Sequence, residues 1–146
     1  MLSFIKKAFS KRKKPHREFT HAVLGPMTYM HDGSYWEAAN GDIFHSIPGD
    51  ETGPNADSVK FIQNKIDSLD HYFEQCSEDL LSIAHTWDSI DKALTAKEIF
   101  KVSAISVEAE GNREWEICFE TKSDYKWVYI GLQFEGEEIV SNDIST

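Results

Sequence analysis

The hydrophobic and polar positions of the chain follow two different periods, and the period changes twice. From Val59 to Leu94 the apolar residues recur at alternating spacings of three and four, which is typical of amphipathic helix. On either side of this segment apolar and polar residues alternate, which is typical of strands with one buried face. The pattern therefore predicts an α+β fold with an N-terminal β-hairpin region, two to three central helices and a C-terminal antiparallel β-meander packed on the helices.

Two turn signals divide the N-terminal β-region. Asp32-Gly33 should supply the positive-φ residues of a tight turn, with a strand over residues 23–29 before it and a return strand from Tyr35 after it. A second break at Asn40-Gly41 precedes another apolar stretch, and "SIPGDETGPNAD" then has the composition of a loop. We expect three short strands here.

The central segment, residues 57–94, contains no Gly or Pro, so one long helix or a coiled coil has to be considered. A single helix would be about 57 Å long at ~1.5 Å per residue, which is too long for a compact domain of this size. We therefore expect two helices, with a restart at "CSEDLL" and Ser77 as the N-cap. Thr95 and Glu98 have the capping-box spacing and predict a short third helix through Phe100.

The alternation of the C-terminal strands predicts their register. A three-residue connection over residues 110–112 pairs Val107 with Trp115, so that the apolar sets of both strands share one face, whereas a two-residue turn would place Val107 opposite Glu116. In the next strand, Val128, Ile130, Leu132 and Phe134 then point inward. The residues predicted to lie on the outer surface, and our candidate partner-binding residues, are Glu108, Glu114, Glu116, Glu120, Trp127 and Tyr129.

This acidic outer surface has two interpretations. Like charges directly opposite one another destabilise a sheet, yet a solvated face can tolerate them. Alternatively, a cationic partner neutralises the carboxylates while the two aromatic residues supply anchors of the type enriched at interface hot spots.

Charge is distributed unevenly along the chain. Residues 1–17 hold seven of the 15 Lys and Arg residues and no acid, so residues 18–146 set the other eight against all 25 acids and carry a formal charge of −17. We therefore divide the chain into a basic leader, 1–17, and one acidic α+β domain, 18–146. The field of the domain repels nucleic acid and favours a basic protein partner.

The leader leaves several roles open: a solubilising tail, a clamp onto the acidic domain, a nucleic-acid contact, or a short amphipathic helix that makes weak contact with an anionic membrane surface. No segment has the ~20 apolar residues of a membrane span, and the leader does not have the order of a secretory signal. We therefore expect a cytoplasmic location.

No motif for catalysis or cofactor binding occurs in the sequence. The six histidines lack metal-ligand spacing, and the eight glycines form no phosphate-binding loop. Cys76 falls in the apolar helix pattern and Cys118 in the middle of a strand, neither at a helix start nor beside a basic cluster, so reduced, packed thiols are expected. Close pairs of carboxylates are expected from the abundance of acids alone, so they are weak evidence for a hydrolase. We expect no enzyme activity, no metal and no cofactor.

Residues 20–145 resemble a group of uncharacterised bacterial domains. The matching pieces are "FTHAVLGPMTYMHDGSYWEA", "TWDSIDKALTAKEIFKVSAISVEAEGNREWEICFE" and "YKWVYIGLQFEGEEIV". The chain departs from the group in the meander, where the group often has a Gly-His pair and this chain has Tyr129-Ile130-Gly131. Domains of this kind are similar to those of bacterial toxin–immunity loci, in which a small acidic protein binds and neutralises a toxin.

The resemblance and the charge together favour a non-enzymatic, immunity-type protein that neutralises a basic toxin, such as a nuclease, by direct binding. The alternative is a peripheral membrane-associated adaptor anchored by residues 1–17.

Overall fold

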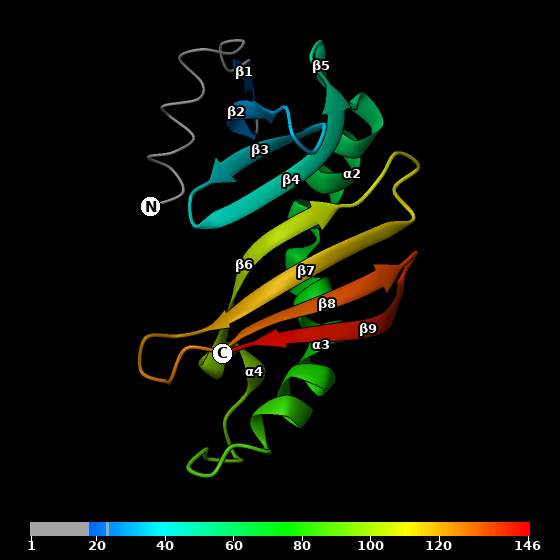
Figure 1. Cartoon of the computed structure of the whole chain (residues 1–146). Helices are drawn as coiled ribbons and strands as arrows, with labels where there is room; N and C mark the ends of the chain where they lie inside the picture. Colours follow the sequence, from blue (N-terminus) through cyan, green and yellow to red (C-terminus); the bar gives the residue numbers. More distant parts are fainter. Residues whose placement is uncertain (1–17, 23) are drawn as a thin grey trace.

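The computed structural model describes residues 18–22 and 24–146, and it is an α+β fold (Figure 1). The strands are β1 (Glu18–His21), β2 (Gly25–Met30), β3 (Tyr35–Asn40), β4 (Ile43–Asp50), β5 (Gly53–Pro54), β6 (Phe100–Val107), β7 (Glu114–Thr121), β8 (Tyr129–Glu135) and β9 (Glu138–Ser145). The helices are α2 (Ala56–Asp67), α3 (Leu69–Ala84) and α4 (Ala96–Ile99).

All of these strands belong to one mixed sheet, in the order β1-β2-β3-β4-β6-β7-β8-β9, with β5 paired to β4 alone. Neighbouring strands are antiparallel except β4 and β6, which are parallel and pair over residues 44–46 and 104–106. The predicted hairpin region and the predicted meander are therefore the two halves of a single sheet.

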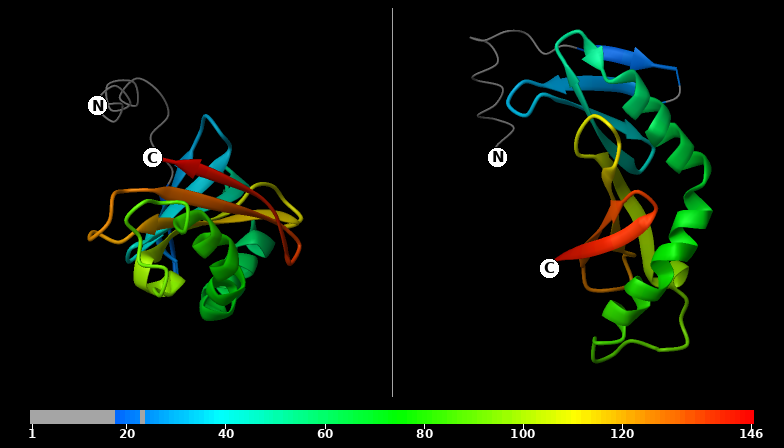
Figure 2. Two further views of the ribbon diagram at one scale, coloured as in Figure 1. Left: turned by 90° about the horizontal axis from the view of Figure 1, so that it is seen from below. Right: turned by 90° about the vertical axis from the view of Figure 1, so that its right-hand side faces the viewer.

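Helices α2 and α3 follow one another along one face of this sheet (Figure 2). Their apolar residues contact the inward side chains of the strands: Phe61 of α2 packs edge-on against Trp115, and Phe73 of α3 packs against Phe119. The buried residues of both halves form one hydrophobic core, which includes Ile47 and Ile117, both 0% exposed. We call the opposite face of the sheet, which these helices leave uncovered, the outer face.

Two central helices are confirmed, but the predicted break was wrong. The helices meet at Ser68, whose φ of −109° and ψ of 23° are not helical, whereas Ser77 lies inside α3 and its hydroxyl donates to the carbonyl of Phe73 at 2.8 Å. A Ser within a helix can bond back to the preceding turn, so a potential N-cap residue does not require a helix start.

The second helix also ends earlier than its apolar pattern suggested, at Ala84. Residues 85–94 continue as turns, although Trp87, Ile90 and Leu94 still pack against the core. The capping box of Thr95 and Glu98 is confirmed, and the short helix that it starts, α4, ends at Ile99, one residue before the predicted end.

The segment "SIPGDETGPNAD" is not simply a loop, and over residues 18–22 and 24–54 the β-region has five strands rather than three. Strand β4 continues to Asp50, and the short strand β5 returns along it. The extension is held by Trp36, whose indole N–H donates to the carbonyl of Asp50 at 2.9 Å, and it carries the buried Ile47. A tertiary hydrogen bond and burial thus override the turn-forming composition of this segment.

The turn between β2 and β3 lies where Asp32-Gly33 predicted it, but Ser34 rather than Gly33 has the positive φ, +54°. Gly33 has another role, since a Cβ at this position would collide with the ring of Tyr35. The glycine therefore allows that ring to lie against the turn.

The predicted register of the meander is confirmed. Val107 pairs with Trp115 and Ile105 with Ile117, and the four apolar residues of the next strand, including Val128 just before β8, are buried. The connection is longer than three residues, because β6 ends at Val107 and β7 begins at Glu114. A bulge between Val102 and Ala104 shifts the register nearer the start of β6, where Val102 pairs with Phe119.

The two cysteines, Cys76 and Cys118, are buried and unbridged, as expected. Within the described part of the chain, no helix has the length and apolar character to span a bilayer. The proposed roles of the leader fall outside the described residues.

Candidate functional site

A continuous row of polar side chains crosses the outer face. Strand pairing places one polar residue from each of β2, β3, β4, β6, β7, β8 and β9 beside the next. This polar row consists of Thr28, Glu37, Ser46, Ser106, Glu116, Gln133 and Ser141. The parallel pairing of β4 with β6 is what connects its two halves, through Ser46 and Ser106.

Three of the predicted partner-binding residues gather around the middle of this row. Glu108 follows β6, and its backbone N–H donates to the carbonyl of Glu114 at 3.2 Å, so the two residues lie opposite each other. Glu116 lies two residues further along β7 on the same face. We call Glu108, Glu114 and Glu116 the acidic group.

The electrostatics of the acidic group are repulsive. Partial burial raises the pKa of Glu108, and the neighbouring charges of Glu116 and Glu114 raise it further. None of the ion pairs between described residues involves any of the three carboxylates. The group is therefore a concentration of negative charge that residues 18–22 and 24–146 leave without a paired cation.

Within this group, Glu116 has the most intramolecular contacts. Its carboxylate accepts hydrogen bonds from the side-chain amide of Gln133 and from the thiol of Cys118, the latter at 3.2 Å. Gly131 leaves room for it, since a Cβ there would collide with the Glu116 carboxylate. Burial raises the pKa of Cys118 to about 12, so this thiol is protonated at neutral pH and is a poor nucleophile.

The other three predicted residues form a second cluster, near the opposite end of β7 from Glu114. Glu120 is already paired within the chain: it accepts from the indole N–H of Trp127 at 3.1 Å and forms an ion pair with Lys101 at 3.4 Å. The rings of Trp127 and Tyr129 lie 6.0 Å apart, and Trp127 is 50% exposed. Glu120 lies six positions along β7 from Glu114, a distance of about 20 Å.

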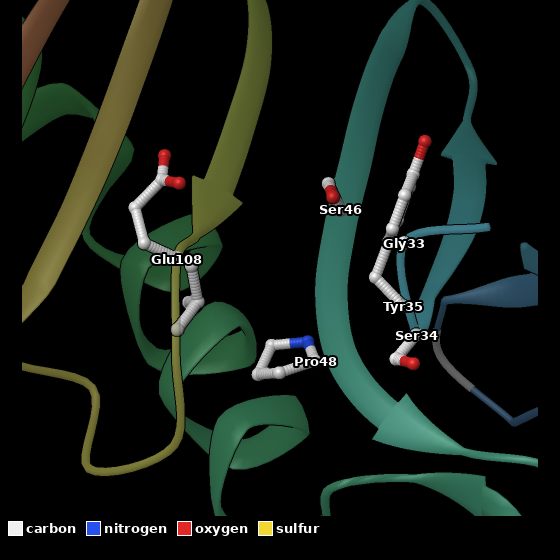
Figure 3. Close-up of a pocket in the computed structure, with 7 residues that line it drawn as sticks. Gly33, Ser34, Tyr35, Ser46, Pro48 and Glu108 are labelled. Atoms are coloured by element: carbon white, nitrogen blue, oxygen red, sulfur yellow. The ribbon is translucent and has the colours of Figure 1, made fainter.

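Sequence reasoning missed a cleft beside the acidic group. The cavity has a volume of about 280 Å³ and lies between β4 and β6. Figure 3 shows Glu108 on the β6 side and Tyr35 on the β3 side, with Ser46 and Pro48 of β4 between them. Tyr35 is held by its hydroxyl, which donates to the carboxylate of Glu37 at 3.2 Å.

The cleft exists because the two parallel strands pair only briefly. After Ser46 and Ser106, β6 ends within one residue, while β4 continues to Asp50 in contact with β3 and β5. Glu108 is thus the first residue beyond the carboxyl end of a parallel strand, a common position for binding residues in sheets of this kind. No sequence signal could place Tyr35 near Glu108, because 73 positions separate them and the pairing between β4 and β6 is non-local.

A further charged cluster lies on the helix side of the sheet. The ammonium of Lys65 donates to the hydroxyl of Tyr72 at 2.6 Å and to the carboxylate of Glu137 at 3.0 Å, and it lies 4.6–4.8 Å from the ring centroids of Phe61, Tyr72 and Trp115. The hydroxyl, the carboxylate and the three rings already surround the Lys65 ammonium, so we assign the cluster a structural role.

Residues 18–22 and 24–146 contain no group of three His, Cys, Asp or Glu side chains placed to hold a metal ion.

In comparisons with known proteins, no family model, no curated protein and no solved structure matches the chain. Function is therefore inferred from the outer face.

Proposed function

We propose that this protein is a non-enzymatic binding protein of the immunity type, which neutralises a basic toxin domain by covering it with the outer face. The observation that carries the proposal is the acidic group. Three carboxylates lie together on a sheet face that α2 and α3 leave open, and the chain pairs none of them with a cation within the described residues.

The energetics of this arrangement favour a cationic partner. Folding places Glu108 opposite Glu114, which destabilises the sheet, and a bound positive charge would convert this repulsion into attraction. The formal charge of −17 on residues 18–146 adds long-range steering, which accelerates association with a basic protein and makes it dependent on salt.

The aromatic side chains complete the proposed interface. Trp127 presents half of its surface to solvent beside Tyr129, and large aromatic residues of this kind often supply much of the binding energy at an interface. Glu120 contributes indirectly, because it fixes the orientation of the Trp127 indole. The acidic group would then attract the partner, and Trp127 and Tyr129 would anchor it.

The test is affinity capture from the source bacterium with the immobilised full chain, at low and at high salt. We expect recovery of a basic protein that is released at high salt. The combined variant Glu108→Gln, Glu114→Gln and Glu116→Gln should weaken its binding by about tenfold or more, because these charges act at close range.

The matched control removes three exposed acids from α2 and α3, on the other side of the molecule. It combines Asp67→Asn, Glu74→Gln and Glu78→Gln and leaves the acidic group intact. We expect a change of no more than about twofold, from the altered net charge alone. Failure to recover a basic partner, or equal weakening by the two variants, would contradict the proposal.

A further inference from the structure

The cleft between β4 and β6 has the dimensions of a site for one side chain. Pockets for drug-sized ligands and cofactors usually measure roughly 300–1,000 Å³, and this cavity, at about 280 Å³, lies below that range. It opens on the outer face beside the acidic group. A protruding side chain of a bound partner can therefore enter it while the rest of the partner lies on the sheet.

The walls of the cleft combine hydrogen-bond acceptors with flat apolar surfaces. Glu108 lies on the β6 side, with its carboxylate beside the end of β6 and turned towards β7 in Figure 3, and Ser46 contributes a hydroxyl from β4. The aromatic ring of Tyr35 and the ring of Pro48 supply the apolar surfaces. A ligand with a planar, positively charged, multiply donating head and an apolar stem matches these groups.

Arginine matches this description better than lysine. The guanidinium group is planar, carries five N–H donors and stacks on aromatic rings, and it is more weakly hydrated than an ammonium group. A lysine ammonium is a compact, strongly hydrated charge, which would lose more solvation in a cleft with two apolar walls.

The surroundings of the cleft also favour a cation. Glu37 lies two residues from Tyr35 on β3 and accepts a hydrogen bond from its hydroxyl. Glu114 and Glu116 lie on β7, the strand next to β6. Partial burial raises the pKa of Glu108, and repulsion from Glu116 and Glu114 raises it further. A guanidinium in the cleft would relieve this repulsion.

We propose that the cleft between β4 and β6 receives an arginine side chain of the basic partner, with Glu108 as its charge partner and Tyr35 as its stacking surface. This inference rests on the proposed function, since it specifies which group of the partner the outer face recognises.

Two peptides of equal charge test the arginine assignment on the full chain. One is acetyl-Lys-Lys-Arg-Lys-Lys-amide, and in the other lysine replaces the central arginine, so that general electrostatic attraction is the same for both. We expect the arginine peptide to bind about five- to tenfold more tightly, as measured by calorimetry at low salt. The amide resonances of Ser46 and Glu108 should shift with the arginine peptide.

The variants locate the preference in the cleft. Ser46→Phe fills the cavity from β4 and should bring the affinity ratio of the two peptides close to one. Glu108→Gln removes the charge, keeps the size of the side chain and leaves the core intact, and it should lower the ratio several-fold. The matched control is Ser82→Phe, which adds the same ring at an exposed position of α3, on the opposite side of the sheet from the cleft (Figure 2), and should keep the preference.

The outcomes separate this inference from the proposed function. Equal binding of the two peptides, or a preference that Ser46→Phe and Glu108→Gln both leave unchanged, would overturn the arginine assignment and leave recognition of basic partners by the outer face standing. Binding of neither peptide would overturn both proposals.

Discussion

At the scale of single residues, His45 shows how strongly the core overrides the preference of a polar side chain for water. It lies on the inner side of β4 between Ala38 of β3 and Ile105 of β6, and it is 0% exposed. Among the described residues, neither ring nitrogen finds a hydrogen-bond partner of good geometry. Burial therefore lowers the pKa of His45 from 6.5 to about 4, although the backbone of Ile105 offsets part of the effect.

This burial predicts a loss of stability in mild acid. The unfolded chain takes up a proton on His45 below pH 6.5, whereas the folded chain does so only near pH 4. The stabilisation is therefore complete above pH 6.5 and is lost as the pH falls from 6.5 towards 4. Between about pH 7 and about pH 4.5, the free energy of unfolding should fall by about 2 kcal/mol through this residue.

Urea unfolding of His45→Leu at the two pH values measures this contribution, because the variant lacks the titrating ring and the contributions of all other groups cancel in the comparison. The exposed His71 provides the control, and His71→Gln should keep the full acid loss. An acid loss of the same size in His45→Leu and in the unmodified protein would contradict the assignment.

At the scale of elements, Lys65 connects parts of the fold that the sheet alone does not join. It extends from α2 to Tyr72 of α3 and to Glu137 in the turn between β8 and β9, across the rings of Phe61 and Trp115. The Lys65 side chain is 10% exposed, whereas that of Glu137 is 64% exposed. Most of the stabilisation is thus expected from the buried end, where the ammonium meets the hydroxyl and the rings.

Replacement of Lys65 by Met keeps the apolar stem and removes the ammonium. We expect the free energy of unfolding to fall by about 1–3 kcal/mol, because the cation–π contacts and a hydrogen bond to Tyr72 are lost while Glu137 can return to water. The matched control is Lys60→Met on the exposed side of the same helix, which should change stability by less than about 0.5 kcal/mol. Equal effects of the two substitutions in urea unfolding would show that the cluster contributes nothing.

At the scale of the whole molecule, three residue pairs between β4 and β6 join the two halves of the sheet, and α2 and α3 pack across the join. The core is shared, since Trp36 and Ile47 of one half and Trp115 and Ile117 of the other belong to the same cluster. Neither half can expose its inner face without exposing the helices as well. We therefore expect the described chain to unfold as one unit.

Hydrogen exchange in a core variant tests this cooperativity. Ile117→Val in β7 removes one buried methylene and should cost about 1 kcal/mol. If the sheet is one unit, the slowest amides of β3 should lose as much protection as those of β7, although β3 is remote from the substitution. A loss confined to β6–β9 would show two independently stable halves.

The fold was predictable as far as local periodicity specifies it. The helical spacing predicted two central helices, and the alternation from Ile105 to Phe119 predicted the register of β6 and β7, because a shift of one residue would have exposed the apolar side chains. The break at Ser68 was not predictable, since no Gly or Pro marks it and Ser77 offered a better N-cap. Strand β4 beyond Ser46 was missed because its turn-rich composition concealed the bond between Trp36 and Asp50.

The candidate site was also predictable only in part from the sequence. By itself, the sequence determined the acidic charge of residues 18–146 and the outward direction of Glu114, Glu116 and Tyr129, because both depend on composition and on a period of two. Only the tertiary structure decided that Glu120 is neutralised by Lys101, and that Tyr35 and Ser46 form a cleft with Glu108. The physical reason is that these contacts depend on the parallel pairing of β4 with β6 and on side-chain reach between strands, neither of which leaves a local pattern in the chain.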